Sequence, residues 1–311
     1  MNAWQASTSV RARAVPERFP PEVVVEVKAL ACELPATLGV PLSRLSSADV
    51  RREAQREGIV ATVSDKTVWR WLHEDAIRPW QHRAWIFPRD PQFALKAGRI
   101  LDLYARRWNG EPLGANDFVL STDEKTSIQA RVRCHPSDPP APGQPMRVEH
   151  EYARGGALAY LAALDVHRVK VFGRCEATTG IVPFERLVTQ VMTQAPYATA
   201  DRVFWIADNG SSHRGEPSVE RLRAAFPNAI LVHGPVHASW LNQIEIYFSI
   251  VQRKVLTPND FNSLGEVEER LLAFQLYYES IAQPFQWRFN RGNLDELMRR
   301  LETPQALRPA A

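Results

Sequence analysis

The sequence has few cysteines, no long apolar run and almost no excess of charge of either sign. Cys32, Cys134 and Cys175 lie far apart without a Cys-x-x-Cys pair, which argues against a disulfide framework and a cysteine zinc site. No run of about eighteen apolar residues and no signal-peptide pattern is present. We therefore expect a cytoplasmic protein without a membrane span.

Charge balance gives little indication of a partner. The chain has 38 Lys and Arg against 35 Asp and Glu, a formal net charge of +3. Without a polybasic segment, nucleic-acid binding would have to come from local patches and a reading helix. The length of 311 residues, with 45% apolar side chains, predicts a globular chain of two domains.

Two short apolar runs each end in an aspartate. Residues 202–207 precede Asp208 and a turn signal, and residues 118–122 precede Asp123. Both runs have the pattern of buried strands, so each aspartate is expected at or just beyond a strand end. Strand ends of an α/β sheet are where sites collect.

A third acid, Glu245, lies within a predicted helix over residues 239–256. Ser239 is the expected N-cap, and the apolar stripe consists of Leu241, Ile244, Phe248, Val251 and Val255. Glu245 lies one residue from this stripe, so we expect it to be half-buried, which is costly unless a metal or a cation compensates its charge. Alone, Glu245 is more simply a surface glutamate beside the core.

Together, the two aspartates and Glu245 form a set of oxygen ligands. Such a set suits hard divalent cations such as Mg²⁺. Two such ions can activate an attacking oxygen and stabilise the leaving oxygen of a phosphodiester. The sequence therefore indicates metal-dependent phosphodiester chemistry.

Four motifs resemble one known family, the transposases of the bacterial insertion-sequence branch of the mariner superfamily. These motifs are Asp123-Glu124-Lys125-Thr126, Glu149-His150-Glu151-Tyr152, Asp208-Asn209 with His213, and Ser239-Trp240-Leu241-Asn242-Gln243-Ile244-Glu245 followed by Phe248-Ser249. The resemblance covers roughly residues 60 to 290, and 36 residues separate Asp208 from Glu245, close to the family spacing. Each motif is weak alone, but four in the family's order are specific.

The resemblance implies a DNA transposase with a DDE triad of Asp123, Asp208 and Glu245. Two Mg²⁺ ions, replaceable by Mn²⁺, would be held by this triad. The implied partners are double-stranded DNA, as element terminal repeats and as target, and a second copy of the chain on that DNA. The protein would then be associated with the nucleoid.

Four polar residues are candidates for supporting roles. Lys125 is expected on the same side of the extended chain as Asp123, where it could neutralise a phosphate. The resemblance implies that Asn209 and His213 orient a metal-bound water or contact the scissile phosphate, although a loop histidine is more often a surface residue. Asn242 precedes Glu245 by one helical turn and could hydrogen-bond to it.

The fold implied for the second half is a ribonuclease H-like α/β domain, with a mixed five-stranded sheet between helices, preceded by an all-α helix-turn-helix domain. A helix over residues 93–108 and an irregular loop over residues 134–156 are also expected. The expected organisation is a disordered lead-in (1–21), a helix-turn-helix domain (22–76), a linker and bridging helix (77–116), the catalytic domain (117–290) and a C-terminal tail (291–311).

The expected helix over residues 64–75 would read DNA from the major groove. Its outward residues are Lys66, Thr67, Arg70 and His73, and Arg78 and Arg83 in the following connector could lie along phosphates. An ordinary small helical bundle is the alternative. Because the family commonly has a further helix-turn-helix ahead of this one, we expect weak binding by a monomer, pairing of two subunits or a shortened gene product.

Two other functions remain open at this point. A nuclease of the same fold could cut DNA without joining strands, and a strand-transfer assay would separate it from a transposase. A DNA-binding regulator with a retired catalytic domain is the other alternative. The intact set of three acids argues against such a regulator.

Overall fold

The computed structural model describes residues 19–82, 88–210, 213 and 215–302. The chain divides into two compact units, residues 1–86 and 87–311. The predicted disordered lead-in falls largely on residues outside this description, as does Arg83. No helix among the described residues is long and apolar enough to span a membrane.

The first unit contains three helices around one small core. They are α1 (Pro21–Ala31), α2 (Ser47–Arg56) and α3 (Asp65–Glu74). Serine caps fix the starts of α2 and α3: Ser46 and Asp49 form a capping box, and the Ser64 side chain accepts a hydrogen bond from Thr67 N. Val68, Trp71 and Leu72 turn inward from α3. A core of this kind supports the predicted helix-turn-helix arrangement of α2 and α3.

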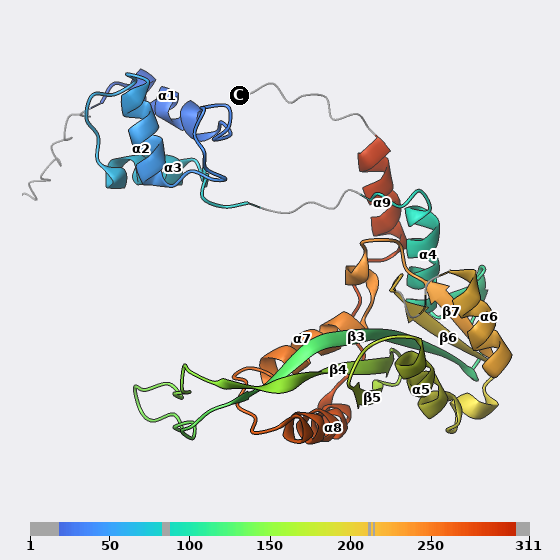
Figure 1. The fold of residues 1–311 in the computed structure, drawn as a ribbon. Helices are drawn as coiled ribbons and strands as arrows, with labels where there is room; N and C mark the ends of the chain where they lie inside the picture. The colour runs from blue at the N-terminus through green and yellow to red at the C-terminus, as the bar shows by residue number, and fades with distance from the viewer. Residues whose placement is uncertain (1–18, 83–87, 211–212, 214, 303–311) are drawn as a thin grey trace, which may run out of the picture. The chain divides into compact units, whose positions relative to one another are not determined.

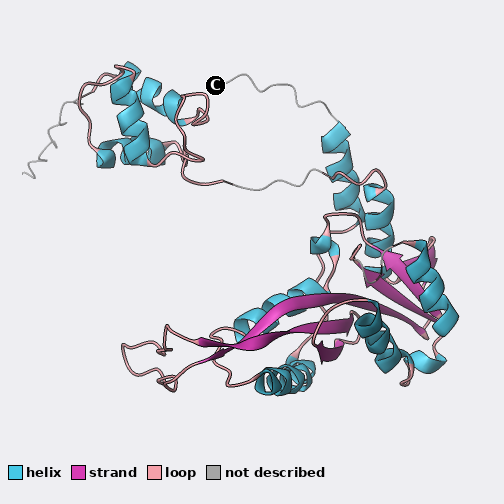
Figure 2. Ribbon diagram, viewed as in Figure 1, coloured by secondary structure: helices cyan, strands magenta, loops and turns pink. Residues whose placement is uncertain are grey.

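The second unit is built on a five-stranded sheet with helices on both faces (Figures 1 and 2). Its strands are β3 (Asp117–Val132), β4 (Ala153–Asp165), β5 (Lys170–Glu176), β6 (Arg202–Ala207) and β7 (Ala229–His233). Their spatial order is β5-β4-β3-β6-β7, with the pairs among β3, β4 and β5 antiparallel and the β3–β6 and β6–β7 pairs parallel. The ribonuclease H-like fold predicted from the sequence is therefore confirmed.

The remaining elements of this unit surround the sheet. They are α4 (Phe93–Tyr104), the two-stranded pair β1 (Arg107–Trp108) and β2 (Glu111–Pro112), α5 (Ile181–Met192), α6 (Glu216–Ala225), α7 (Ile244–Lys254), α8 (Leu264–Ile281), α9 (Arg291–Glu302) and two short 3₁₀ helices, Tyr197–Thr199 and Ser239–Leu241. Helices α5 and α6 pack on one face of the sheet, and α7 and α8 pack on the other.

Successive side chains of β3 point alternately to the two faces of the sheet. Phe118 and Leu120 enter the core beneath α5 and α6, whereas Val119 packs on the opposite face with residues of α4. Because successive side chains of a strand point to opposite faces, Ser121 and Asp123 project to the same face as Val119. Strand β3 therefore presents Asp123 to the face on which α7 packs.

Three predicted elements were wrong in extent or kind. The helix beginning at residue 93 ends at Tyr104, and Arg107–Trp108 is a strand. The C-terminal segment contains α9, which packs against α4 through Leu294 and its neighbours instead of forming a tail. The irregular loop predicted over residues 134–156 ends earlier than expected, because β4 begins at Ala153. Strands β3 and β4 form a two-stranded ribbon that extends beyond the sheet (Figure 2).

Candidate active site

The two aspartates come from neighbouring parallel strands. Ser121 of β3 lies opposite Ile206 of β6 in the register, so Asp123 and Asp208 each follow two residues later. Adjacent strands lie about 4.8 Å apart, and the carboxyl ends of parallel strands meet at one edge. The sheet therefore brings both carboxylates to the same place. Asp208 directly follows the end of β6, as predicted, whereas the expected position of Asp123 at a strand end was wrong, because β3 continues past it to Val132.

Glu245 lies in the first turn of α7 and approaches the two aspartates from there. The start of α7 is bonded to β3. Asn242 Nδ2 donates to Thr122 O at 2.9 Å, and Ile244 N donates to Ser121 Oγ at 2.9 Å. Ser121 Oγ also donates to Asn242 Oδ1. Because all of these groups are buried, they define one position of α7 on the sheet.

A second anchor comes from Tyr104 at the end of α4. Its hydroxyl donates to Leu241 O at 2.8 Å and accepts from Gln243 N at 3.2 Å. Burial raises the pKa of Tyr104 far above its usual value, so it remains a neutral donor. The segment before α7 is therefore held by both β3 and α4.

Two sequence-based expectations about this segment were wrong. The Asn242 side chain bonds to Ser121 and Thr122 of β3, and only its backbone carbonyl meets Glu245 N. Ser239 begins a 3₁₀ turn without capping through its side chain, and α7 starts at Ile244. The apolar stripe itself is confirmed, because Leu241, Ile244, Phe248, Val251 and Val255 are all buried.

The three acids influence one another electrostatically. Burial raises the pKa of Asp123 to about 7, and the negative charges of Asp208, Glu124 and Glu245 add to that rise. Burial and the charge of Asp208 raise the pKa of Glu245, while Lys125 opposes them. Lys125 is therefore close enough to act on Glu245. A cluster that resists ionisation in this way favours a compensating cation.

Asp208 keeps its charge through a hydrogen bond to His213. His213 Nε2 lies 2.5 Å from Asp208 Oδ1, which also accepts from Gly210 N at 2.7 Å. The bond to His213 lowers the pKa of Asp208. Burial opposes protonation of His213, but the bond to Asp208 and the charges of Glu124, Asp208 and Asp123 outweigh it and raise the His213 pKa.

The implied contact of His213 with a phosphate is therefore not the arrangement found here. Its side chain is 0% exposed and packs 5.1 Å, between ring centroids, from Phe184 of α5. Asn209 is also turned away from the acids, since its Nδ2 donates to Gly234 O at 2.7 Å. Asn209 thus links the end of β6 to Gly234, and His213 positions the carboxylate of Asp208.

The sequence interpretation missed Ser121, Thr122 and Tyr104. A signal for the first two was present, because two hydroxyl residues interrupt an otherwise apolar strand. Buried polar groups require partners, which here come from the segment before α7 and from Ala162 O of β4. Tyr104 had no comparable signal, since its partners lie 137 and 139 residues away.

The donors suit a divalent cation in chemical type. Within the described ranges, however, no three His, Cys, Asp or Glu side chains are arranged as a finished metal site. Glu245 makes no side-chain hydrogen bond to the described residues, so its carboxylate is not committed to another partner. The site thus offers three carboxylates of a kind that hard cations prefer.

The predicted reading helix is exposed on the side expected for it. On α3, Lys66, Arg70 and His73 are exposed, and Thr67 is partly buried. His73 stacks on Trp69, with ring centroids 4.8 Å apart, and Trp69 is 46% exposed. Arg78, after the helix, is also exposed. Trp69 lies between residues that were predicted to contact DNA, but it was not itself predicted to do so.

Comparison with known proteins defines the class of the domain. Residues 119–268, which include all three acids, match the family model described as DDE superfamily endonuclease. This part of the chain is therefore similar to a DDE superfamily endonuclease domain. No curated protein matches the chain in sequence.

The fold is similar to that of solved structures of the Mos1 transposase. A pre-cleavage Mos1 transpososome matches with 16% identity and a TM-score of 0.52, covering 95% of this chain and 80% of that chain. The Mos1 strand transfer complex matches with 15% identity and a TM-score of 0.51, covering 95% and 79%. The mariner Mos1 paired end complex with Mg matches with 14% identity and a TM-score of 0.52, covering 96% and 81%.

Proposed function

We propose that this protein is a DNA transposase that binds the ends of its element, cleaves there and joins the freed 3′-hydroxyl to target DNA. The observation that carries the proposal is the meeting of Asp123, Asp208 and Glu245 beside the end of β6, coupled by charge, in a region that matches the DDE superfamily endonuclease model. Solved structures of the same fold include a Mos1 strand transfer complex.

In this proposal the three carboxylates hold two Mg²⁺ ions, with Mn²⁺ as a substitute. Bound ions of this kind supply activation of the attacking oxygen and stabilisation of the leaving oxygen. The raised pKa of Asp123 supports a cation there, since a positive charge would favour its ionised form. Related Mos1 complexes contain Mg or Mn.

The chain's own residues then have distinct roles. Asp123, Asp208 and Glu245 are the metal ligands, and His213 keeps Asp208 ionised and oriented. Asn242 holds Glu245 in position through the start of α7. Lys125, whose charge acts on Glu245, is placed to neutralise a phosphate.

We also propose that α3 reads the element end in the major groove through Lys66, Thr67, Arg70 and His73, with Arg78 on the phosphates. Single small modules bury only about 600 to 1,000 Å² on DNA, so two copies of the chain on paired ends would supply the needed specificity. Mos1 forms paired end complexes. Location in the cytoplasm and on the nucleoid follows from this activity and stays a prediction.

The test is to incubate the purified chain with its own element ends and Mg²⁺ and to map nicks at nucleotide resolution. A second reaction supplies pre-cleaved ends and labelled target DNA. Nicks at the ends together with joined products support a transposase. Nicks without joining would indicate a nuclease, and binding without nicks a regulator, and either outcome would overturn the proposal.

A further inference from the structure

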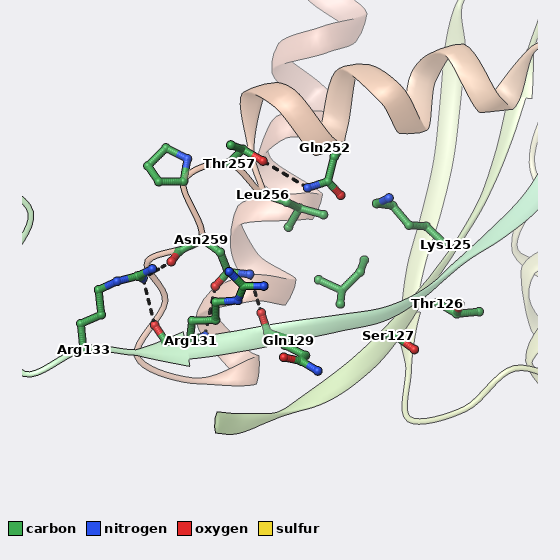
Figure 3. Close-up of a pocket in the computed structure, with 12 residues that line it drawn as sticks. Lys125, Thr126, Ser127, Gln129, Arg131, Arg133, Gln252, Leu256, Thr257 and Asn259 are labelled. Carbon is green, nitrogen blue, oxygen red and sulfur yellow. Dashed lines mark hydrogen bonds between the residues drawn. The ribbon is translucent and has the colours of Figure 1, made fainter. Parts of the chain in front are cut away.

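A groove lies beside the carboxylates, between the distal half of β3 and the end of α7. Its volume is ≈ 400 Å³, and the residues that matter here are Lys125, Gln129, Arg131, Arg133, Gln252 and Asn259. Figure 3 shows Lys125 near Gln252, away from the end where Arg131, Arg133 and Asn259 lie together. Gln252 follows Glu245 by two helical turns, so the groove leads away from the acids along α7.

The groove has the charge of an anion site. Three of its lining residues are basic and none is acidic. Arg133 is occupied by the protein, because it donates to Glu149 O at 2.7 Å and lies 3.6 Å from Asp260, with its side chain 7% exposed. Lys125 and Arg131 form no ion pair within 4 Å with the described residues. These two cations are therefore available to a ligand.

Arg131 is held in place but forms no ion pair with the described residues. Its backbone N–H donates to Asn259 Oδ1 at 3.0 Å, and its guanidinium lies 4.7 Å from the centre of the Tyr152 ring. Nε of Arg131 is buried without a hydrogen-bond partner in the described structure. A buried charged donor without a hydrogen-bond partner is costly, and an acceptor on a bound ligand would remove that cost.

The strand opposite adds a second unbalanced charge. Arg154 of β4 is the register partner of Arg131. Directly opposed residues of an antiparallel pair share a face, and like charges there are destabilising. A phosphate near Arg131 would relieve this repulsion, and Arg–phosphate contacts are among the stronger charge-assisted hydrogen bonds.

We propose that this groove binds the phosphodiester backbone of DNA that leads away from the cleaved bond, with Arg131 and Lys125 contacting phosphates. The inference rests on the proposed function and names a further part of its DNA site. Arg131 follows Asp123 by eight positions on β3, which at about 3.3 Å per residue is roughly 25 Å. A DNA strand advances about 3.4 Å per nucleotide, so the contact should fall about seven nucleotides from the cleaved bond.

The test uses the full chain and duplexes in which single phosphates are replaced by neutral methylphosphonates, scanned on both sides of the cleaved bond. One set carries the replacement in the DNA flanking the element end, and another carries it in target DNA. Binding is measured by fluorescence anisotropy, which requires no cleavage. We expect wild-type affinity to fall about tenfold at one or two phosphates and Arg131→Gln to be insensitive there.

Arg131→Gln keeps a planar side chain over Tyr152, and its melting temperature checks folding. Arg131→Lys should retain part of the sensitivity. Arg223→Ala removes an exposed arginine from α6, at the β7 side of the sheet (Figure 1), and should behave as wild type. Sensitivity in the flank identifies donor DNA as the ligand, and sensitivity in the target identifies target DNA.

Identical sensitivity of wild type and Arg131→Gln at every position, in both sets, would overturn the groove assignment. The outcome is separable from that of the proposed function. A chain that nicks and joins DNA, but in which wild type and Arg131→Gln are equally sensitive at every phosphate, refutes the groove alone. A chain that shows the Arg131-dependent phosphate contact but never nicks refutes the transposase and leaves the groove.

Discussion

His213 Nε2 lies 2.5 Å from Asp208 Oδ1, and the imidazole ring is completely buried behind the carboxylate. The hydrogen bond holds the pKa of Asp208 below its usual value, in a site where burial and like charges raise the pKa of Asp123 and Glu245. His213 thus keeps one of the three acids ionised before any cation arrives.

Replacing His213 by asparagine should therefore weaken metal use. Partners that orient a metal ligand typically contribute about 10- to 100-fold in affinity or activity. We expect cleavage by His213→Asn to require about 10- to 100-fold more Mn²⁺ for half-maximal rate. His167→Asn is the control, because His167 lies at the β4–β5 turn and bonds to Tyr104 O. An unchanged Mn²⁺ dependence of His213→Asn would contradict the positioning role.

The link between Asn242 and β3 should affect both stability and activity. Asn242→Ala removes the partner of Ser121 and of Thr122 O in a buried network. Loss of such partners costs about 1–3 kcal/mol, so the free energy of unfolding in urea should fall by about that amount. Cleavage should fall as well, because Glu245 starts from this segment. Asn262→Ala, at an exposed position before α8, should change neither quantity.

These contacts also show how far the sequence could predict the site. The site residues Asp123, Asp208 and Glu245 could be predicted because each acid follows an apolar run or borders a helical stripe, and the family motifs agree. The partners of Asn242 could not be predicted, since Ser121 is 121 residues away and only the packing of α7 on β3 brings them together. The burial of the His213 side chain could not be predicted for the same reason, because it depends on packing against α5.

The same distinction holds for the fold. The five-stranded sheet followed from the family resemblance and the buried face of α7 from its periodicity, but the length of β3 followed from neither. Pairing with β4 carries β3 through polar residues as far as Val132, past the point where the apolar pattern stops. Helix α9 was missed because its apolar partners belong to α4, far away in sequence.

The raised pKa of Asp123 predicts proton competition with the metal. Below about pH 7 its carboxyl is increasingly protonated, and a cation must displace that proton to bind. As the pH is raised toward 7, Mn²⁺ affinity should therefore increase by up to about tenfold per pH unit, and it should level off above pH 7. Asp208, whose pKa is lowered, stays ionised over this range.

Titration of Mn²⁺ by calorimetry at several pH values from about 5.5 to 8 measures this dependence. Asp123→Asn should bind Mn²⁺ weakly and lose the rise in affinity. Equal affinity of the wild-type chain for Mn²⁺ on both sides of pH 7 would contradict the pKa assigned to Asp123.

Arg70 tests the reading role of α3. Its side chain is 65% exposed, and Nε lies 4.0 Å from Glu74. If Arg70 contacts a guanine edge, Arg70→Ala should weaken binding to the element end by about 1 to 3 kcal/mol and leave binding to random DNA nearly unchanged. If it contacts phosphate alone, both DNAs should lose affinity equally and the salt slope should fall by about one unit.

Arg52→Ala is the matched control for Arg70, since Arg52 lies on α2, is 58% exposed and pairs with Asp49. It should bind both DNAs as wild type does. An Arg70→Ala chain with unchanged affinity for both DNAs would exclude Arg70 from the interface and return α1–α3 to a plain helical bundle.

In the proposed function, Asp123, Asp208 and Glu245 form one metal-dependent centre for cutting DNA. The most direct measurement compares wild type with Asp123→Ala, Asp208→Ala and Glu245→Ala on labelled element ends in Mg²⁺, recording nicks and binding on the same samples. We predict that each substitution abolishes nicking while binding through the first unit is retained. Substantial nicking by any of the three variants would contradict the account.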